Sequence, residues 1–384
     1  PDGLDVFRNF VVPIPVTAPR YVRGVEFRPG SAAVHHANIR LDYTRASRQL
    51  DDADPGPGYE GIILHSADYP DGHFLGWTPG QFAPLAPKGL AWRLQPNADF
   101  VVQLHMRPSG KPERIAPRIG LYFTDDAPVV LPVMLRLGRQ NLDIPAGEAH
   151  YPSHDSYVLP VEARVEAVQP HSHYRARDVR AIAELPNGTT QPIIRIAKWD
   201  FAWQDVYRLA EPLALPQGAV VTMKWTYDNS SANRHQRHVP PERVKAGNRS
   251  SDEMAHVQLQ MELASVADRP RLQEAYYRYL LRKDASNARV LYGLGGALKD
   301  QGRLPEAAGF YEQALARVPD HVNAHINLGA VLMQRFAAEA AVLAGRPAGR
   351  SGPAPRRGPP VADHSVVGRP IRRWWLRSPT RSIR

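Results

Sequence analysis

The sequence predicts a mainly β protein that ends in a short helical segment and a tail without regular structure. Three observations lead to this prediction. Residues 1 to about 265 contain short apolar runs separated by Pro, Gly, Asn and Asp, which is typical of antiparallel strands. Beyond Asp268 the apolar residues recur with a helical period. From about Phe336 the composition turns to Ala, Gly, Pro and Arg, which does not support a packed core.

The β part is expected to form two tandem antiparallel sandwiches of the jelly-roll type. Pro186-Asn187-Gly188 predicts a hairpin turn. A break near Asn141–Pro152 predicts a domain boundary, so we expect domains at residues 1–145 and 146–267. The strand pattern is clearest in five runs: Tyr21–Phe27, Phe100–His105, Arg118–Phe123, Val179–Leu185 and Ala219–Tyr227.

The helical part is expected at residues 268–335 and resembles tetratricopeptide repeats. After a helical pattern at Arg271–Arg282, Leu294-Gly295 recurs 34 residues later as Leu328-Gly329. The small, aromatic and helix-stopping residues of such a repeat are also present, at Ala307, Tyr311, Ala314 and Pro319. We expect one complete repeat, Ala288–His321, and the first helix of a second. The alternative is a generic alanine-rich helical hairpin. If the segment is a tetratricopeptide repeat, it implies a protein partner.

Residues 336–384 are expected to form a low-complexity basic tail. Between Arg335 and Arg384 lie eleven Arg and two acidic residues, so this stretch carries +9 of the net charge of +10. The remaining chain is nearly neutral, which argues against nucleic-acid binding. We expect the tail to be disordered or an artefact of the reading frame. No apolar run is long enough to span a membrane, and the start at Pro1 indicates a processed or excised fragment.

The candidate chemistry begins with a histidine pair after a strand-like run. Val161–Val168 alternates apolar and polar residues, and an extended chain would point His171 and His173 to one face. Such a pair is half a metal site, although a solvated or hydrogen-bonded pair is the simpler alternative. The 384 residues include no cysteine, which excludes disulfides, thiolate zinc sites and iron–sulfur clusters. Any metal therefore needs His, Met or oxygen ligands.

Two further segments carry histidines in strand-like surroundings. His35 and His36 are adjacent, so both can face one site only at a strand end or a bulge. His105 closes an apolar strand. Each of these histidines, taken alone, is better explained as a buried, hydrogen-bonded side chain than as a metal ligand.

The order of these segments resembles the ligand sequence of the type II copper, ascorbate-dependent monooxygenases, which include peptidylglycine α-hydroxylating and dopamine β-monooxygenases. That order is His-His, a strand-borne His, His-x-His and finally Asp-Glu-Met, here Asp252-Glu253-Met254. Trp199–Gln204 and Trp225–Ser230 are similar to the bacterial branch. The resemblance covers about residues 7–265.

This resemblance implies two copper ions per chain. His35, His36 and His105 would hold the electron-transfer copper of the first domain. His171, His173 and Met254 would hold the oxygen-binding copper of the second domain and act as its catalytic residues. The implied reaction hydroxylates a C–H bond of a small organic substrate with O2 and a reductant such as ascorbate. The bacterial branch implies an exported protein, periplasmic or extracellular.

Departures from the family leave the substrate and two other functions open. Peptide-amidating members have Arg two residues before the His-x-His pair, and Asn and Tyr shortly after the Met. Here Gln169, His256 and Gln258 occupy these places, so a peptidylglycine substrate is not expected. A copper-binding protein without turnover is one alternative. An interaction scaffold that works through its repeats is the other.

Overall fold

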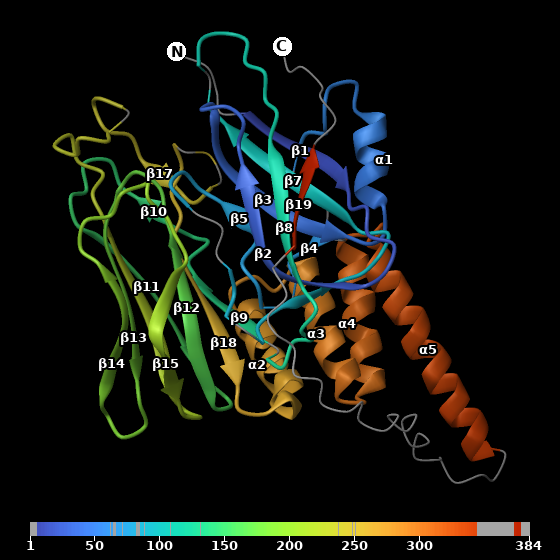
Figure 1. Cartoon of the computed structure of the whole chain (residues 1–384). Helices are drawn as coiled ribbons and strands as arrows, with labels where there is room; N and C mark the ends of the chain where they lie inside the picture. The colour runs from blue at the N-terminus through green and yellow to red at the C-terminus, as the bar shows by residue number, and fades with distance from the viewer. Residues whose placement is uncertain are drawn as a thin grey trace, which may run out of the picture. The chain divides into compact units, whose positions relative to one another are not determined.

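The chain divides into two compact units in the computed structural model. The structure describes residues 6–343 and 372–377, except residues 62, 64–66, 71, 82–84, 88, 108, 131, 237, 248 and 250. The first unit comprises Pro1–Leu272 and Arg373–Arg384, and the second comprises Gln273–Arg372. Strands dominate the first unit and helices the second (Figure 1). The predicted mainly β chain with a helical segment is therefore confirmed.

Two sheets build the first β region. One has the strand order β1-β7-β3-β4, with β5 also paired to β3, and the other has the order β19-β8-β2-β6. A short helix, α1, follows β3. The bounds are β1 Val6–Pro13, β2 Arg20–Arg28, β3 Val34–Asp42, α1 Ala46–Ala53, β4 Ala67–Asp68, β5 Gly76–Trp77, β6 Trp92–Leu94, β7 Asp99–Met106, β8 Arg118–Thr124 and β19 Arg372–Arg377.

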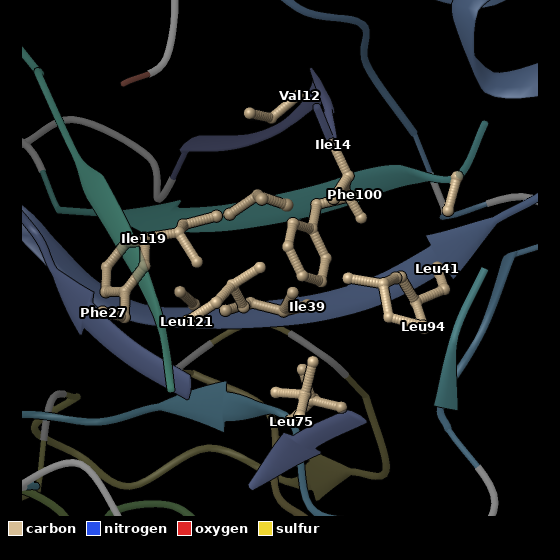
Figure 2. Close-up of a cluster of buried hydrophobic side chains, with 14 of the residues drawn as sticks. Val12, Ile14, Phe27, Ile39, Leu41, Leu75, Leu94, Phe100, Ile119 and Leu121 are labelled. Carbon is tan, nitrogen blue, oxygen red and sulfur yellow. The ribbon is translucent and has the colours of Figure 1, made fainter. Parts of the chain in front are cut away.

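One apolar cluster joins side chains from both of these sheets (Figure 2). Ile39 of β3 and Phe100 of β7 meet Leu121 of β8, and all three are at most 1% exposed. Burying one such side chain contributes roughly 1.5–3 kcal/mol. The cluster therefore fixes β3 and β7, the two strands that carry the first histidines.

Two four-stranded sheets and one two-stranded sheet build the second β region. Their orders are β11-β16-β13-β14, β15-β12-β18-β9 and β10-β17 (Figure 1). The predicted hairpin turn is confirmed, because Gly188 has a φ of 82° and joins β13 to β14. The bounds are β9 Val133–Gly138, β10 Asp143–Ile144, β11 Tyr151–Val158, β12 Ala163–His171, β13 Ala176–Glu184, β14 Thr190–Ile196, β15 Tyr207–Leu215, β16 Val220–Tyr227, β17 Val244–Lys245 and β18 His256–Leu263.

The boundary between the β regions lies earlier than predicted. β9 precedes residue 145, yet it pairs with β18 over Val133–Gly138 and completes the sheet of β12. Its alternating burial, with Leu135 and Leu137 inside, suits a sheet that is buried on one face. The sequence break near Asn141–Pro152 is therefore a connection within the second region.

The helical unit has the predicted repeat geometry. Its helices are α2 Arg269–Leu281, α3 Ala288–Asp300, α4 Leu304–Arg317 and α5 Val322–Leu343. The Asn287 side chain accepts a hydrogen bond from Val290 N at 3.2 Å and caps α3. A Cβ placed on Gly295 would lie 2.7 Å from the Tyr311 ring. The signature glycine thus allows α3 and α4 to approach closely.

The predicted end of the helical part at residue 335 is too early. α5 continues to Leu343, because Ala-rich sequence after Phe336 has high helix propensity. Arg372–Arg377 forms β19, where no regular structure was predicted, and pairs with the edge of β8. The remaining predicted tail, residues 344–371 and 378–384, lies outside the described residues. Among the described helices, none is long and apolar enough to cross a membrane.

Candidate metal centre

The first histidine set, His35, His36 and His105, lies where β3 pairs with β7. His36 is directly opposite His105 in the antiparallel register. The register shifts between Val34 and His36, so His35 lies in an irregularity of the strand. Neighbouring residues of a regular strand point to opposite faces, and a bulge removes this restriction. The strand irregularity that joint ligation by adjacent histidines would need is therefore present at His35.

The three rings converge on a small volume. One ring nitrogen from each histidine lies within 4.8 Å of the others. Nδ1 of His36 and Nδ1 of His105 are 3.1 Å apart. The His35 and His105 rings are perpendicular, with centroids 5.2 Å apart. Within the described residues, this is the group of His, Cys, Asp or Glu side chains whose geometry suits a metal ion.

The surroundings of this set favour neutral imidazoles. Burial lowers the pKa of His36 well below its usual value, and nearby His105 and His171 lower it further. Phe7 stacks on His105 with ring centroids 4.3 Å apart. Nη2 of Arg107 lies 2.7 Å from Nδ1 of His35, which has to accept this hydrogen bond. A metal on that nitrogen would therefore replace the Arg107 contact.

The second histidine pair, His171 and His173, lies at the end of β12. The two rings are nearly perpendicular, with centroids 5.4 Å apart. Nδ1 of His171 lies 2.7 Å from Oε1 of Gln204, and Nδ1 of His173 lies 3.0 Å from the carbonyl oxygen of Asp252. Both oxygens can only accept a hydrogen bond, so the hydrogen atom of each neutral imidazole lies on its Nδ1. Both Nε2 atoms then keep a lone pair for a metal.

Burial also keeps His171 neutral. Burial, first of all, and the nearby His173 and Arg136 lower the pKa of this histidine to about 3, although the hydrogen bond that its Nδ1 donates to Gln204 acts to raise the pKa. A metal competes with protons for an imidazole nitrogen, so a neutral ring binds metal more readily at pH 7.

Glu253, a member of the Asp-Glu-Met motif, holds the turn that carries these histidines. Its side chain is fully buried. Oε1 accepts hydrogen bonds from His173 N at 2.5 Å and Met254 N at 2.9 Å, and Oε2 accepts one from Arg175 N at 2.9 Å. Ser172 Oγ lies 2.8 Å from Oε1. Two of these backbone donors, His173 N and Arg175 N, join the turn after β12 to Glu253, and the third, Met254 N, comes from the neighbouring residue.

Met254, the predicted third ligand of the second copper, is brought beside the pair by its backbone. Its carbonyl oxygen lies 2.6 Å from Ser172 Oγ and accepts a hydrogen bond from Tyr227 OH at 2.7 Å. Ser172 is the residue between the two histidines. The Met254 side chain is half-buried.

The segment between β14 and β15 supplies contacts to the histidines that the sequence alone does not reveal. Gln204 accepts from His171, and its Nε2 donates to the Phe201 carbonyl oxygen at 3.0 Å, which fixes the orientation of its amide. Nε1 of Trp199 donates to the His173 carbonyl oxygen at 3.0 Å. The sequence shows these residues only as similarity to a family, because nothing local indicates that a loop reaches the histidines.

A polar row crosses the sheet next to His171. Gln169 of β12 pairs with Gln258 of β18, which pairs with Arg136 of β9, so the three side chains share a face. In the next row, the rings of His171 and His256 lie 6.2 Å apart at 15°. Nη2 of Arg136 lies 2.8 Å from Nδ1 of His256. The guanidinium group of Arg136 thus comes from the same face of the sheet as Gln169, but two strands away.

The donor set fits copper. Two imidazole nitrogens that bind one ion at about 2.0–2.1 Å lie roughly 3–4 Å apart, and the separation of 3.1 Å between His36 and His105 falls within this range. Neutral imidazoles and a thioether are ligands that copper accepts in both of its oxidation states. His171 and His173 provide two further nitrogens with defined tautomers.

Comparison with known protein families identifies the helical segment. Residues 268–322 and 300–354 match the tetratricopeptide repeat. The segment is therefore a repeat of this type, as predicted. The match covers the helical segment only and does not extend to the histidines of the β regions. No curated protein matches this chain.

Solved structures give weak likenesses. The VP2 subviral particle of infectious bursal disease virus aligns with 10% identity and a TM-score of 0.21, over 64% of this chain and 58% of that chain. A two-domain protein of unknown function from Bacteroides fragilis aligns with 7% identity and a TM-score of 0.15, over 67% of this chain and 94% of that chain. TM-scores of this size do not establish a common fold.

Proposed function

We propose that this chain is a copper-dependent monooxygenase. It would hydroxylate a C–H bond of a small organic substrate with O2 and a reductant such as ascorbate. The observation that carries the proposal is the convergence of three histidine nitrogens within 4.8 Å, at a strand irregularity of the kind that joint ligation by His35 and His36 would need. The β regions would then be two sandwich domains, each with one copper. The ligands would be His35, His36 and His105 in the first, and His171, His173 and Met254 in the second.

The protein contributes binding, orientation and exclusion of water. Bound copper supplies one-electron redox chemistry and activates O2. Gln204 and the Asp252 carbonyl group hold the Nδ1 hydrogens of His171 and His173, so that both Nε2 atoms remain ligands. Glu253 fixes the turn between them. His35, His105 and His173 are at most 5% exposed, which limits access of water to the ligands.

The polar row beside His171 is the proposed substrate surface. Gln169, Gln258 and Arg136 offer hydrogen-bond donors on one face of the sheet, close to the second copper site. Relatives that amidate peptides have an Arg at the position of Gln169. Arg136 reaches this face from β9, so it could bind a polar acceptor group of the substrate. The contacts of such a substrate would differ from those of a peptidylglycine.

Copper stoichiometry tests the proposal. The wild-type chain is expected to bind two copper ions and to show ascorbate-dependent O2 consumption above that of free copper. His171→Ala is expected to lose one ion and the turnover. His154→Ala is a matched control, because His154 is exposed on β11, away from both sets. An active His171→Ala variant with two coppers would contradict the assignment, whereas two bound coppers without turnover would indicate a copper-binding protein.

Binding of a protein partner through the repeat is a second candidate function, and the family match favours it. Tyr292 of α3 and Asn327 of α5 share a hydrogen bond of 2.9 Å, and Lys299 Nζ donates to Asn327 Oδ1 at 3.3 Å. These polar groups join the first helices of successive repeats, the helices that line the concave binding surface of such arrays.

A scaffold would keep its partner after copper is removed. Any partner that copurifies with the chain is expected to remain bound in the presence of a copper chelator. Lys299→Glu is expected to weaken this binding without changing copper stoichiometry. Loss of the partner on chelation would place the interaction on the β region instead.

A further inference from the structure

Phe201 lies between the two histidine sets, which come from different β regions. Its ring centroid is 4.6 Å from that of His35 and 5.6 Å from that of His173. The two histidine rings are therefore no farther apart than these two distances together. Phe201 is 7% exposed, so its ring, and not solvent, fills this space.

Further side chains enclose the Phe201 ring. Tyr174, next to His173, has its ring centroid 4.1 Å away. The Arg107 guanidinium lies 5.9 Å from the centroid of Phe201, and its Nη2 is also 2.7 Å from Nδ1 of His35. Phe201 thus contacts one neighbour of each histidine set in addition to the histidines themselves.

Both ends of the segment around Phe201 are fixed. Trp199 donates to the His173 carbonyl oxygen and packs edge-on against the buried Trp225 at 4.9 Å. Gln204 accepts from His171, and its carbonyl oxygen accepts a hydrogen bond from the hydroxyl group of Thr78 in the first β region. The segment that carries the Phe201 ring therefore cannot leave its position without breaking these hydrogen bonds.

We infer that Phe201 is a positioning residue that sets the distance between the two histidine sets and closes the space between them. This role rests on the proposed function in one respect only. If both histidine sets bind copper, Phe201 also sets the distance between the two copper ions. A phenylalanine that merely fills the core would affect stability when truncated but would leave the spacing unchanged. The spacing is therefore the decisive measurement.

The first experiment measures the spacing without metal. The chain has no cysteine, so Arg118→Cys on β8 and Thr190→Cys on β14 give two exposed labelling sites, one in each β region. Nitroxide labels at these sites report the distance by pulsed electron paramagnetic resonance. With Phe201 present we expect one narrow distribution. Phe201→Ala is expected to broaden it and shift it by more than its original width.

The second experiment measures the spacing with Cu(II) bound. Phe201→Ala is expected to keep two coppers and to show a weaker dipolar coupling between them. Phe201→Leu keeps an apolar side chain and is expected to give an intermediate shift, and it serves if the alanine variant does not fold. Lys198→Ala is the control, because Lys198 belongs to the same loop but is exposed. It is expected to leave both distances unchanged.

The outcomes separate this inference from the proposed function. Unchanged label and copper distances in Phe201→Ala, or in Phe201→Leu if only that variant folds, would overturn the role of Phe201. A label distance that changes in a chain that binds no copper would support the positioning role and reject the copper enzyme. An equal shift in Lys198→Ala would assign the spacing to the loop as a whole and overturn the specific role of Phe201.

Discussion

At the scale of single residues, the second histidine pair depends on a carboxylate that is not itself a proposed ligand. The Glu253 carboxylate accepts hydrogen bonds from three backbone N–H groups and lies within hydrogen-bond distance of the Ser172 hydroxyl group. A buried acceptor with this many donors holds a turn more firmly than side-chain packing alone, because each unmatched N–H would have to be buried without a partner. The motif Asp-Glu-Met thus combines a structural residue with a candidate ligand.

Replacing Glu253 with Gln is expected to destabilise the chain by about 1.5–3 kcal/mol, because the amide NH2 cannot accept from a backbone N–H. The turn that carries His173 should loosen, and copper at the second site should bind more weakly. Denaturant unfolding and copper titration measure the two effects. Glu262→Gln on β18 is the control, since this residue makes a surface ion pair with Arg164 and should cost at most about 1 kcal/mol.

The tautomer of His171 depends on Gln204. Gln204→Leu removes the acceptor of the Nδ1 hydrogen, and the loss of such a partner typically weakens metal binding by about 10–100-fold. We expect that loss for one of the two coppers, measured by titration against a competing chelator. Gln217→Leu, in an exposed turn of the same region, should leave both affinities unchanged. Equal affinities in both variants would show that the Gln204 contact does not orient the ring.

The sequence contained most of the candidate ligands but not their supports. Two histidines at i and i+2, or side by side, are visible in the chain, and the need for a bulge at His35 followed from strand geometry alone. Phe201, Gln204 and Arg136 could not be assigned in this way. They reach the histidines through a loop and a neighbouring strand, and a single sequence does not report such long-range pairing.

At the scale of elements, the repeat helices illustrate why short-range patterns are predictable. The spacing of Leu294-Gly295 and Tyr311 reflects contacts between consecutive helices, so the period in the sequence is also the period in space. β9 is the opposite case. Nothing in Val133–Gly138 indicates that it pairs with β18, which is more than 100 residues away, and the predicted boundary was therefore misplaced.

The two glycines Gly295 and Gly309 are expected to respond oppositely to substitution by alanine. Gly→Ala inside a helix normally stabilises it by up to about 1 kcal/mol. Gly309→Ala should do so, because no other atom lies within 4 Å of the new Cβ. Gly295→Ala should instead destabilise the helical unit, because its Cβ would meet the Tyr311 ring at 2.7 Å. Thermal unfolding followed by helical circular dichroism distinguishes the two. Stabilisation by both would mean that α3 and α4 pack less closely.

The charge cluster around Glu274 of α2 predicts an acid-sensitive helical unit. Burial alone would raise the pKa of Glu274, but hydrogen bonds from Gln301, Arg278 and Arg303 lower it overall below its usual value. A lowered folded-state pKa contributes stability above the unfolded value, and this contribution is lost as pH falls through the folded value. Because the ion pairs of Glu274 are partly exposed, this contribution to the free energy of unfolding is at most about 1 kcal/mol.

Glu274→Gln should therefore weaken the helical unit at pH 7 but make little difference at pH 3. Denaturant unfolding of both proteins at the two pH values, followed at 222 nm, measures this change. Glu312→Gln on α4 is the control, since it makes the same substitution at an exposed site of the helical unit. An equal difference between wild type and Glu274→Gln at both pH values would exclude the ionised carboxylate as the cause.

At the scale of the whole molecule, the two units separate the two candidate functions. The histidine sets belong to the first unit and the tetratricopeptide repeat to the second. All seven tryptophans also belong to the first unit, whereas most of the helix is in the second. Tryptophan fluorescence and circular dichroism at 222 nm thus report mainly on different units of one chain.

Copper is expected to stabilise the first unit alone. A ligand present at 100 times its dissociation constant raises the stability of the state that binds it by about 2.7 kcal/mol. With Cu(I) under anaerobic conditions, which avoids quenching by Cu(II), the fluorescence transition should move to higher denaturant while the 222 nm transition stays in place. If both transitions move together, the units unfold as one. If neither moves, the histidine sets do not hold copper, and the repeat remains the working part of the chain.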